Sequence, residues 1–361
     1  MHLNTLDHAV TASDLSRVTF GLDTFGAVTT QLDGTTTPQA QVIRDIVEEG
    51  RLADQVGVDH FGLGEHHRVE FAVSNPHTVL AGLATVTERI TLGTAVTVLS
   101  SDDPVRVWQQ FAEIDALSNG RAEAVLGRGS FIESYPLFGY DLKDYEELFE
   151  EKLELFELLR EEGPVTWSGR LRAPLTNQQV YPKTERGRIP AWIAVGGSPQ
   201  SVVRAASYGL PLMLAIIGGD PRRFQPFIGL YHQALEKVHE QDASRPTRLP
   251  IAVHSPGFIA ATDEEAYERF VPHWLRTRAK IGAERGWGPP RPDEVRHEIE
   301  HGSLYLGAPE TVARKIAATI RDLGIDRFDL KYDGGMPHAY AMETIERYGT
   351  EVIPMVKELL A

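Results

Sequence analysis

Residues 91–130 contain two apolar strands on either side of a helix, and this order constrains the fold more than any other stretch. A β-branched run over 94–99 precedes a helix that begins at Pro104 and ends at Gly120, and a second apolar run leads into Gly127-Arg128-Gly129-Ser130. The pattern predicts a βαβ unit with parallel strands. A strand that ends in glycines and an arginine can present amides and a guanidinium to an anion. The stretch therefore predicts both a fold and a site.

Strand and helix signals alternate through the rest of the chain, which favours a parallel sheet covered by helices. We predict strands at 18–22, 60–64, 90–96, 122–127, 191–195, 212–217, 251–260 and 328–332. An α/β fold of the TIM (β/α)8 barrel type, as one domain over 1–361, accounts for this order. An open doubly wound sheet is the alternative, but the stretch over 21–26 is a poor match to the glycine-rich loop of that fold.

Two polar segments interrupt the alternation, at about 163–190 after strand 4 and about 276–305 after strand 7. We interpret both as insertions into the barrel. A loop as long as the second is usually functional or disordered, so it is either a lid over the site or a mobile surface excursion.

The composition excludes several kinds of chemistry and partner. The 361 residues include no cysteine, which rules out disulfides, thiolate metal sites and a cysteine nucleophile. Lys and Arg number 36 against 51 Asp and Glu, and a net charge of −15 argues against nucleic acid as a partner. We find no signal-type N-terminus and no apolar run of spanning length. The expectation is a cytoplasmic protein with no membrane contact.

Four polar residues, Glu65-His66-His67-Arg68, come directly after the second predicted strand. In a barrel of this type they would face the mouth where active sites lie. Adjacent histidines diverge in direction and no further ligand pattern is present, so a metal site is disfavoured and we predict none. A histidine acting as general base or hydrogen-bond donor is the preferred interpretation, and a structural role stays open.

The turn after the fifth strand repeats the logic of the first motif. Gly196 and Gly197 let the backbone approach a ligand, and Ser198 stands at the N-cap of a helix that contains Ser201. Free amides and hydroxyls there, together with Arg128 from the neighbouring strand, would receive a phosphate. A well-capped helix without a ligand is the alternative. A phosphate site with a histidine across the mouth suits a phosphorylated planar cofactor, with FMN as the leading candidate.

The ordered set of motifs resembles bacterial luciferase and the luciferase-like flavin-dependent monooxygenases. The resemblance rests on GEHHR, GTAVTVLSSDDPVR, DALSNGRAEAVLGRGS, the GGS turn and ASYGLPLML, which occur in this order over nearly the whole chain. It implies a TIM barrel that binds reduced FMN at the carboxyl ends of its strands. It also implies O2 and a small organic molecule as substrates and a separate flavin reductase as a transient partner.

The resemblance further implies roles for particular residues at the phosphate. Arg128 and Ser130 would bind the cofactor phosphate, with Gly129 between them. The turn after the fifth strand would contribute Gly197, Ser198 and Ser201 to the same phosphate.

At the flavin ring, the resemblance implies a non-prolyl cis peptide bond between Ala95 and Val96, and His66 as the catalytic histidine. The luciferase cysteine near the ring is replaced by Gly127 here. Light emission is therefore not implied.

Two further functions stay open at this point. A dehydrogenase using the deazaflavin F420 shares the fold, and some relatives bind flavin without turnover. A metal-dependent hydrolase would need a ligand cluster that the sequence does not display. Luciferase relatives commonly form dimers, so we also expect a homodimer.

Overall fold

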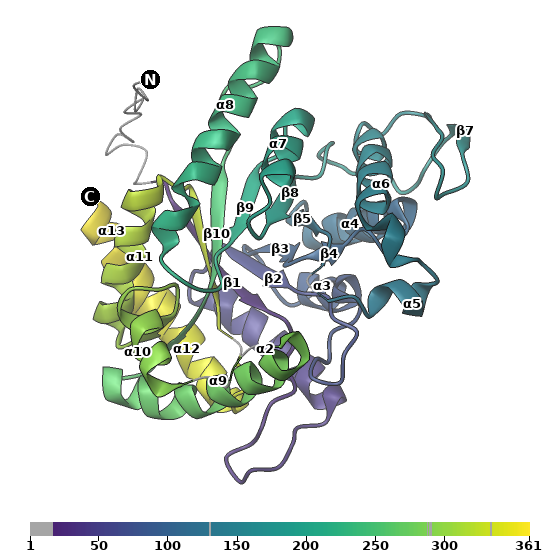
Figure 1. Cartoon of the computed structure of the whole chain (residues 1–361). Helices are drawn as coiled ribbons and strands as arrows, with labels where there is room; N and C mark the ends of the chain where they lie inside the picture. The colour runs from purple at the N-terminus through teal and green to yellow at the C-terminus, as the bar shows by residue number, and fades with distance from the viewer. Residues whose placement is uncertain (1–16, 130, 287, 289–290, 333) are drawn as a thin grey trace.

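The computed structural model describes residues 17–129, 131–286, 288, 291–332 and 334–361. Within these ranges eight parallel strands form a closed barrel, because β10 pairs with both β9 and β12 and β12 pairs with β1 (Figure 1). The barrel strands are β1 (Thr19–Thr24), β2 (His60–Leu63), β3 (Thr91–Thr94), β5 (Ala122–Gly127), β8 (Ala191–Val195), β9 (Leu212–Ala215), β10 (Ile251–Ile259) and β12 (Arg327–Lys331). The predicted TIM barrel is confirmed.

The third predicted strand is divided in two. A short strand, β4 (Thr97–Val98), follows β3 and also pairs in parallel with β5, so the strand is interrupted at residues 95 and 96 and its register against β5 shifts by one residue. The sequence predicted one strand over 90–96 because its apolar run is continuous.

Helices cover the outside of the barrel. They are α2 (Gln39–Gln55), α3 (Pro76–Ala84), α4 (Pro104–Ser118), α6 (Tyr145–Arg160), α7 (Pro199–Tyr208), α8 (Gln225–Gln241), α11 (Pro309–Leu323), α12 (His338–Arg347) and α13 (Ile353–Leu360). A five-residue π-helical turn, Tyr348–Val352, separates α12 from α13. Short segments are α5 (Ser134–Phe138) and the 3-10 turns Leu142–Asp144 and Pro221–Phe224. None of the helices in the described ranges has the length and apolar character needed to cross a membrane.

The inside of the barrel has an apolar part and a charged part. Val125, Trp192, Met213 and Ala252 form a small buried cluster on β5, β8, β9 and β10. Near the amino ends of the strands, Arg327 pairs with Glu123 at 2.5 Å and with Asp329 at 2.7 Å, and all three are buried. Charges this deeply buried require paired partners, and here the barrel supplies them internally.

The first insertion forms an antiparallel hairpin of β6 (Val165–Trp167) and β7 (Leu175–Gln178). The second insertion is largely helical, which differs from the expected loop. It comprises the end of α9 (Asp263–Arg285), α10 (Pro292–Glu300) and the approach to β11 (Tyr305–Gly307). Gly286 ends α9 at a φ of 69°, a conformation that favours glycine. Val295 and Leu304 are buried in a satellite core with Phe258 and Phe270, so the segment packs as part of the fold.

Candidate active site

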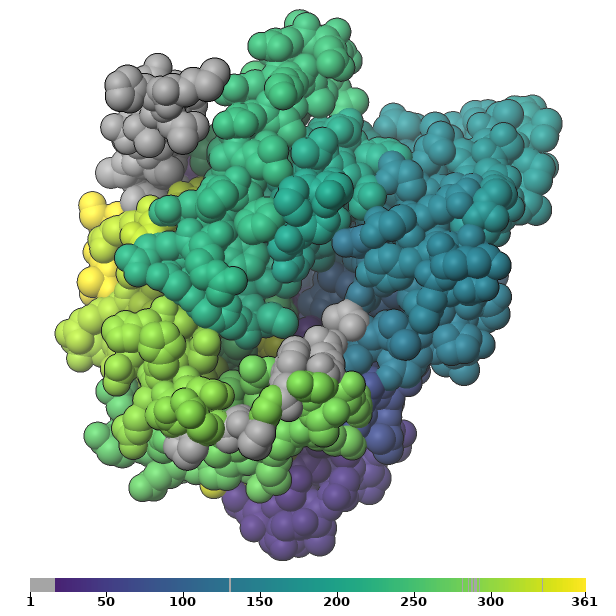
Figure 2. Space-filling view, in the orientation of Figure 1, coloured from purple at the N-terminus to yellow at the C-terminus, as the bar shows by residue number. Residues whose placement is uncertain are grey.

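The carboxyl ends of the barrel strands carry the residues that the sequence singled out. Figure 2 shows this region of the surface hollowed near its centre, between the blue segment after β5 and the yellow-green segment of α9. Arg128 follows β5, Ser198 follows β8 and His66 follows β2. The fold therefore brings three separated motifs to one end of the barrel.

Arg128 lies at the edge of this end, where its guanidinium forms an ion pair with Glu146 at the start of α6. The same guanidinium is 5.1 Å from the ring centre of Tyr145. The Arg128 side chain is 21% exposed and that of Glu146 is 64% exposed. An anion arriving from solvent can therefore reach Arg128, provided that it competes with the Glu146 carboxylate.

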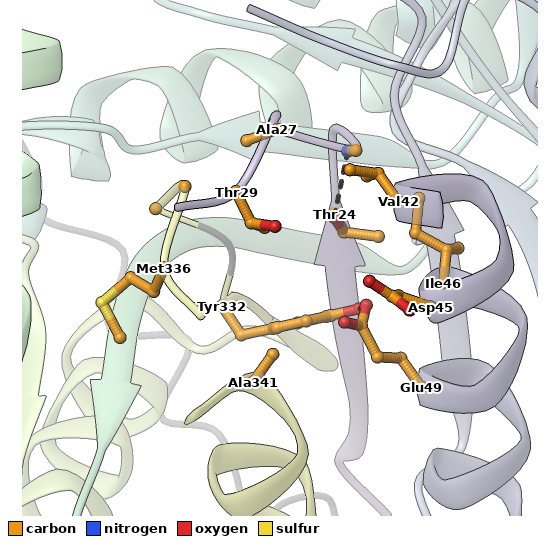
Figure 3. A pocket seen from close by; sticks show the side chains of 13 residues that line it. Thr24, Ala27, Thr29, Val42, Asp45, Ile46, Glu49, Tyr332, Met336 and Ala341 are labelled. Carbon is orange, nitrogen blue, oxygen red and sulfur yellow. Dashed lines mark hydrogen bonds between the residues drawn. The ribbon is translucent and has the colours of Figure 1, made fainter. Parts of the chain in front are cut away.

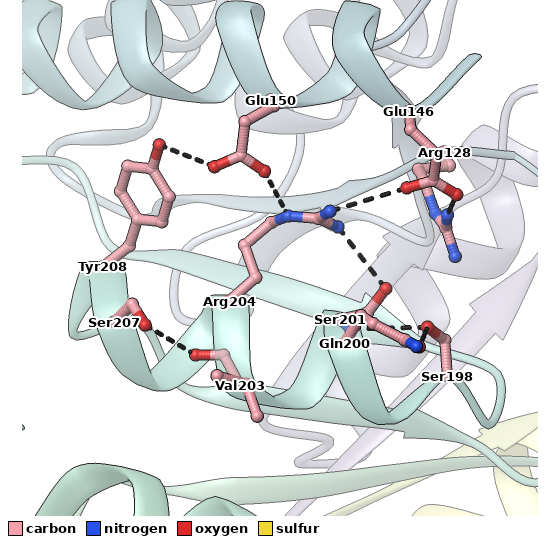
Figure 4. A network of polar contacts seen from close by, with 10 residues as sticks. All are labelled: Arg128, Glu146, Glu150, Ser198, Gln200, Ser201, Val203, Arg204, Ser207 and Tyr208. Atoms are coloured by element: carbon pink, nitrogen blue, oxygen red, sulfur yellow. Dashed lines mark hydrogen bonds and ion pairs between the residues drawn. The ribbon is translucent and has the colours of Figure 1, made fainter. Parts of the chain in front are cut away.

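Helix α7 presents its first turn to the same place (Figure 4). The Ser198 hydroxyl accepts a bond from the Ser201 amide at 3.4 Å, which is the predicted N-cap. Arg204, one turn further on, donates to Ser201 Oγ at 3.5 Å and also pairs with Glu146 and Glu150. Glu146 thus joins Arg128 and Arg204. The sequence did not single out Arg204, although its spacing of three from Ser201 places both on one helix face.

The turn between β8 and α7 leaves room for a ligand beside its backbone. Gly197 has a φ of 119°, which only glycine adopts readily, and a side chain at Gly196 would meet open space. Backbone amides, two hydroxyls and two guanidiniums around an open turn fit a phosphate group. This donor set is the observation on which a phosphorylated cofactor rests.

The peptide bond between Ala95 and Val96 is cis, the geometry that the resemblance implies. The chain of β2 and the residue after it pack closely against this bond. A Cβ on Gly62 would lie 3.1 Å from Ala95 Cβ, and one on Gly64 would lie 3.1 Å from the Ala95 carbonyl oxygen. A Cβ on Gly127 would lie 2.7 Å from Val96 Cγ2. A cysteine side chain at residue 127 would therefore clash with the Val96 side chain as it stands.

His66 is buried among aromatic rings at the barrel mouth. Its ring centre lies 4.7 Å from that of Phe25, 4.3 Å from that of Phe71 and 5.3 Å from that of Phe131. These rings exclude water around the imidazole, a setting in which a proton or hydrogen bond acts strongly on a bound reactant.

His67 points to a different partner. Its Nε2 lies 2.9 Å from Glu65 Oε1, and Glu65 Oε2 accepts a bond from the Val98 amide at 2.9 Å. Glu65 therefore ties the loop that holds His66 to the segment after the cis bond. The two histidines diverge, as the sequence analysis expected of adjacent residues.

The end of α9 lies against the same loop. Arg68 Nη2 pairs with Glu284 on α9 at 2.7 Å, and Lys280 pairs with Glu70. Arg68 also pairs with Glu133 at 2.5 Å. These ion pairs hold part of the second insertion over the segment that carries His66, which fits the lid interpretation of that insertion.

A separate small cavity lies between β1, α2 and the segment after β12 (Figure 3). Its volume is about 20 Å³, room for about one water molecule. Glu49 at its wall accepts a bond from the Tyr332 hydroxyl at 2.7 Å and contacts His338 Nδ1 at 2.9 Å. The His338 pKa is raised, because the bond to Glu49 favours the charged imidazole. This cavity is too small for an organic substrate.

Ser130, which the resemblance assigns to the cofactor phosphate, lies outside the described residues. Among aromatic residues near the mouth, Phe25 and Phe71 flank His66, whereas Tyr135 is fully buried beside Tyr145.

A sequence model described as the luciferase-like monooxygenase family matches residues 24–327. The chain belongs to the luciferase-like monooxygenase family. Both curated relatives described next are named monooxygenases, and the name of one of them states flavin dependence.

Two curated relatives illustrate the range of this likeness. The alkanal monooxygenase alpha chain of the Kryptophanaron alfredi symbiont is 28% identical over 240 residues, covering 65% of this chain and 66% of that relative. The matched part is thus a little under two thirds of that relative. The oxygenase component of a flavin-dependent trigonelline monooxygenase from Acinetobacter baylyi is 24% identical, covering 89% of this chain and 91% of that relative.

Solved structures share the fold at low identity. A monooxygenase from Streptomyces bottropensis has a TM-score of 0.77 at 21% identity and covers 93% of this chain and 99% of its own. The oxygenating constituent of 3,6-diketocamphane monooxygenase from Pseudomonas putida, in complex with FMN, has a TM-score of 0.73 at 18% identity and covers 94% and 98%. The F420-dependent tetrahydromethanopterin reductase of Methanopyrus kandleri has a TM-score of 0.68 at 17% identity and covers 94% and 99%.

Proposed function

We propose that this enzyme uses reduced FMN and O2 to oxygenate a small organic substrate. The observation that carries the proposal is the combination of a phosphate-type donor set at Arg128, Ser198 and Ser201 with a buried histidine, His66, that follows the strand packed against the cis bond at Ala95. A flavin with a single terminal phosphate fits both ends of that arrangement. The relative named as the oxygenase component of a flavin-dependent monooxygenase supports the same class of reaction.

In this proposal Arg128 and the turn at Gly197, Ser198 and Ser201 bind the phosphate, with Gly129 and Ser130 next to them in the chain. Ala95 and Val96 support the ring, and Gly127 leaves space beside Val96. Bound in reduced form, FMN supplies the two electrons that activate O2. His66 donates a hydrogen bond to the reacting oxygen, and the surrounding phenyl rings keep water away.

The proposal includes a partner and a setting. A separate flavin reductase delivers reduced FMN, because none of the described motifs forms a second nucleotide site for a nicotinamide. We also propose that the enzyme is a homodimer and that it is cytoplasmic, as the sequence leads us to expect. Size-exclusion chromatography with light scattering tests the homodimer.

Fluorescence titration of the purified protein with FMN, riboflavin and F420 tests the cofactor. We expect saturable binding of FMN, weaker binding of riboflavin because it lacks the phosphate, and little binding of F420. Coupled assays with a flavin reductase and NADH should then show O2 consumption that depends on the protein. Tight binding of F420 without binding of FMN would instead support the dehydrogenase, and binding without O2 chemistry would support a non-catalytic flavin protein.

A further inference from the structure

A second buried histidine contacts the same Phe25 ring as His66. His254, in the middle of β10, stacks on Phe25 with ring centres 5.7 Å apart and planes 8° apart. His66 contacts the same Phe25 ring from a centre 4.7 Å away. The sequence analysis did not select His254, which lies within an apolar strand.

His254 is held by a carboxylate on β1. Its Nδ1 lies 2.5 Å from Asp23 Oδ2, and the side chains of His254 and Asp23 are 8% and 2% exposed. An ionised carboxylate only accepts, so Nδ1 carries the proton and Nε2 is the nitrogen left for a reactant. This is the arrangement by which a carboxylate orients a catalytic imidazole and supports its charged form.

The pair lies next to the cis bond. Asp23 is the partner of Gly62 in the β1–β2 register, and a Cβ on Gly62 would lie 2.0 Å from Asp23 Oδ1 and 3.1 Å from Ala95 Cβ. The Asp23 carboxylate and Ala95 are therefore neighbours across the Gly62 backbone. The absence of a side chain at residue 62 is what allows this approach.

Other charged groups around the pair are on β12. Asp329 is the register partner of His254, and Lys331 is the register partner of Asp23, with its ammonium 4.6 Å from the Phe25 ring centre. Burial, with the Asp23 charge adding to it, raises the pKa of Asp329 to about 7 against the opposing effect of Arg327. The register partner on β9 is Ala215, which carries no charge. Asp23 is thus the carboxylate in contact with His254, and burial favours the neutral form of Asp329.

We propose that His254 is a second catalytic residue of this site, a general acid that Asp23 positions and that contacts the same Phe25 ring as His66. The inference rests on the proposed function. Reduced FMN would supply two electrons and two protons in all, so that one atom of O2 enters the substrate and the other leaves as water; without substrate, both atoms would leave as hydrogen peroxide. His254 Nε2 would deliver one of these two protons to the departing oxygen and would regain a proton from solvent, to which the flavin releases its own.

The first test uses the free protein and needs no turnover. The hydrogen-bonded Nδ1 proton of His254 should give a downfield imidazole resonance in the proton NMR spectrum, absent from Asp23→Asn and His254→Gln and retained in His66→Ala. Addition of oxidised FMN should shift it, because the ring would lie beside the pair. A resonance that does not respond while FMN fluorescence shows saturable binding overturns the inference.

The second test is the rate at which reduced FMN reacts with O2, followed by stopped-flow absorbance without substrate. His254→Gln should slow this reaction about 10²-fold or more, because the proton donor is lost. Asp23→Asn removes the carboxylate that orients the imidazole, so it should slow the same reaction.

His60→Gln is the matched control, since His60 is a partly buried barrel histidine at the amino end of β2, 4.0 Å from Glu123. This variant should keep the wild-type rate. Circular dichroism and thermal unfolding establish whether each variant is folded. If a variant is not folded, the FMN-induced NMR shift in the wild type still tests whether His254 lies beside the flavin. If Asp23→Asn and His254→Gln both react at the wild-type rate, the inference is contradicted. Failure of the wild type to bind FMN contradicts the proposed function instead.

Discussion

The two ends of the candidate site are built on different physical terms. At the phosphate end, charges face solvent: Glu146 is 64% exposed and pairs with Arg128 and Arg204 on neighbouring segments. At the ring end, His66, Asp23 and His254 are each less than one tenth exposed. Phe25 contacts both histidines, and Phe71 and Phe131 contact His66. Ion pairs within reach of solvent hold the residues of the phosphate end in place, whereas buried packing and hydrogen bonds hold those of the ring end.

This difference separates affinity from chemistry. Exposed ion pairs contribute about 0–1 kcal/mol and weaken with salt, so an incoming phosphate can replace Glu146 at little cost. Buried hydrogen bonds in a dry pocket are stronger and change little with ionic strength. Variants at the phosphate end should therefore alter FMN affinity with little effect on the reaction rate. Variants at the ring end should alter the reaction rate with little effect on FMN affinity.

The largest expected effect is at the ring end. His66→Ala should leave FMN affinity unchanged but shorten the interval between O2 addition and the return of oxidised FMN absorbance. The hydrogen bond from His66 stabilises the reacting oxygen, and loss of one such donor should shorten this interval about 10²- to 10³-fold. Stopped-flow absorbance measures the interval, and His67→Ala, whose side chain contacts Glu65, should change it far less. An unchanged interval would show that His66 does not act on the reacting oxygen. A large loss of FMN affinity would show that the ring end also determines binding.

The second effect is at the phosphate end. Arg128→Ala should weaken FMN binding by about 1.5–3 kcal/mol, roughly a 10- to 150-fold rise in Kd, because a charge-assisted bond to phosphate is lost. Riboflavin binding should be nearly unchanged, and the reaction of bound reduced FMN with O2 should keep its rate. Arg170→Ala is the control, since Arg170 pairs with Asp144 and Glu147 on the outer surface. Equal losses for FMN and riboflavin would show that Arg128 does not contact phosphate.

The parts of the site that the sequence predicted are those where one short stretch carries its own signal. Gly127-Arg128 ends an apolar strand, and Ser198 precedes a proline at the start of a helix, so local patterns located both. The cis bond at Ala95 has no local signal and came from the resemblance. The second insertion was misjudged because its prolines and glycines suggested a loop, whereas they mark the ends of two helices.

The parts that the sequence did not predict depend on how the barrel closes. Asp23 and His254 are 231 positions apart and meet because β12 pairs with both β1 and β10, which sets the register that aligns them. Arg204 and Glu146 come from helices outside the strands, and their contact depends on how α6 and α7 lie over the mouth. Periodicity gives the face of each residue but not its distant partner.

Glu146 offers the smallest and most discriminating change. Glu146→Gln removes a negative charge from between Arg128 and Arg204, so FMN should bind roughly two- to fivefold more tightly at low salt, and the gain should shrink as salt rises. Glu147→Gln removes the same charge from the adjacent position, where the carboxylate pairs with Arg170, and should leave affinity nearly unchanged. Riboflavin should not distinguish Glu146→Gln from the wild type. If Glu146→Gln weakened FMN binding, the carboxylate would be organising the two guanidiniums rather than competing with phosphate, and the phosphate end would then depend on fixed geometry as the ring end does.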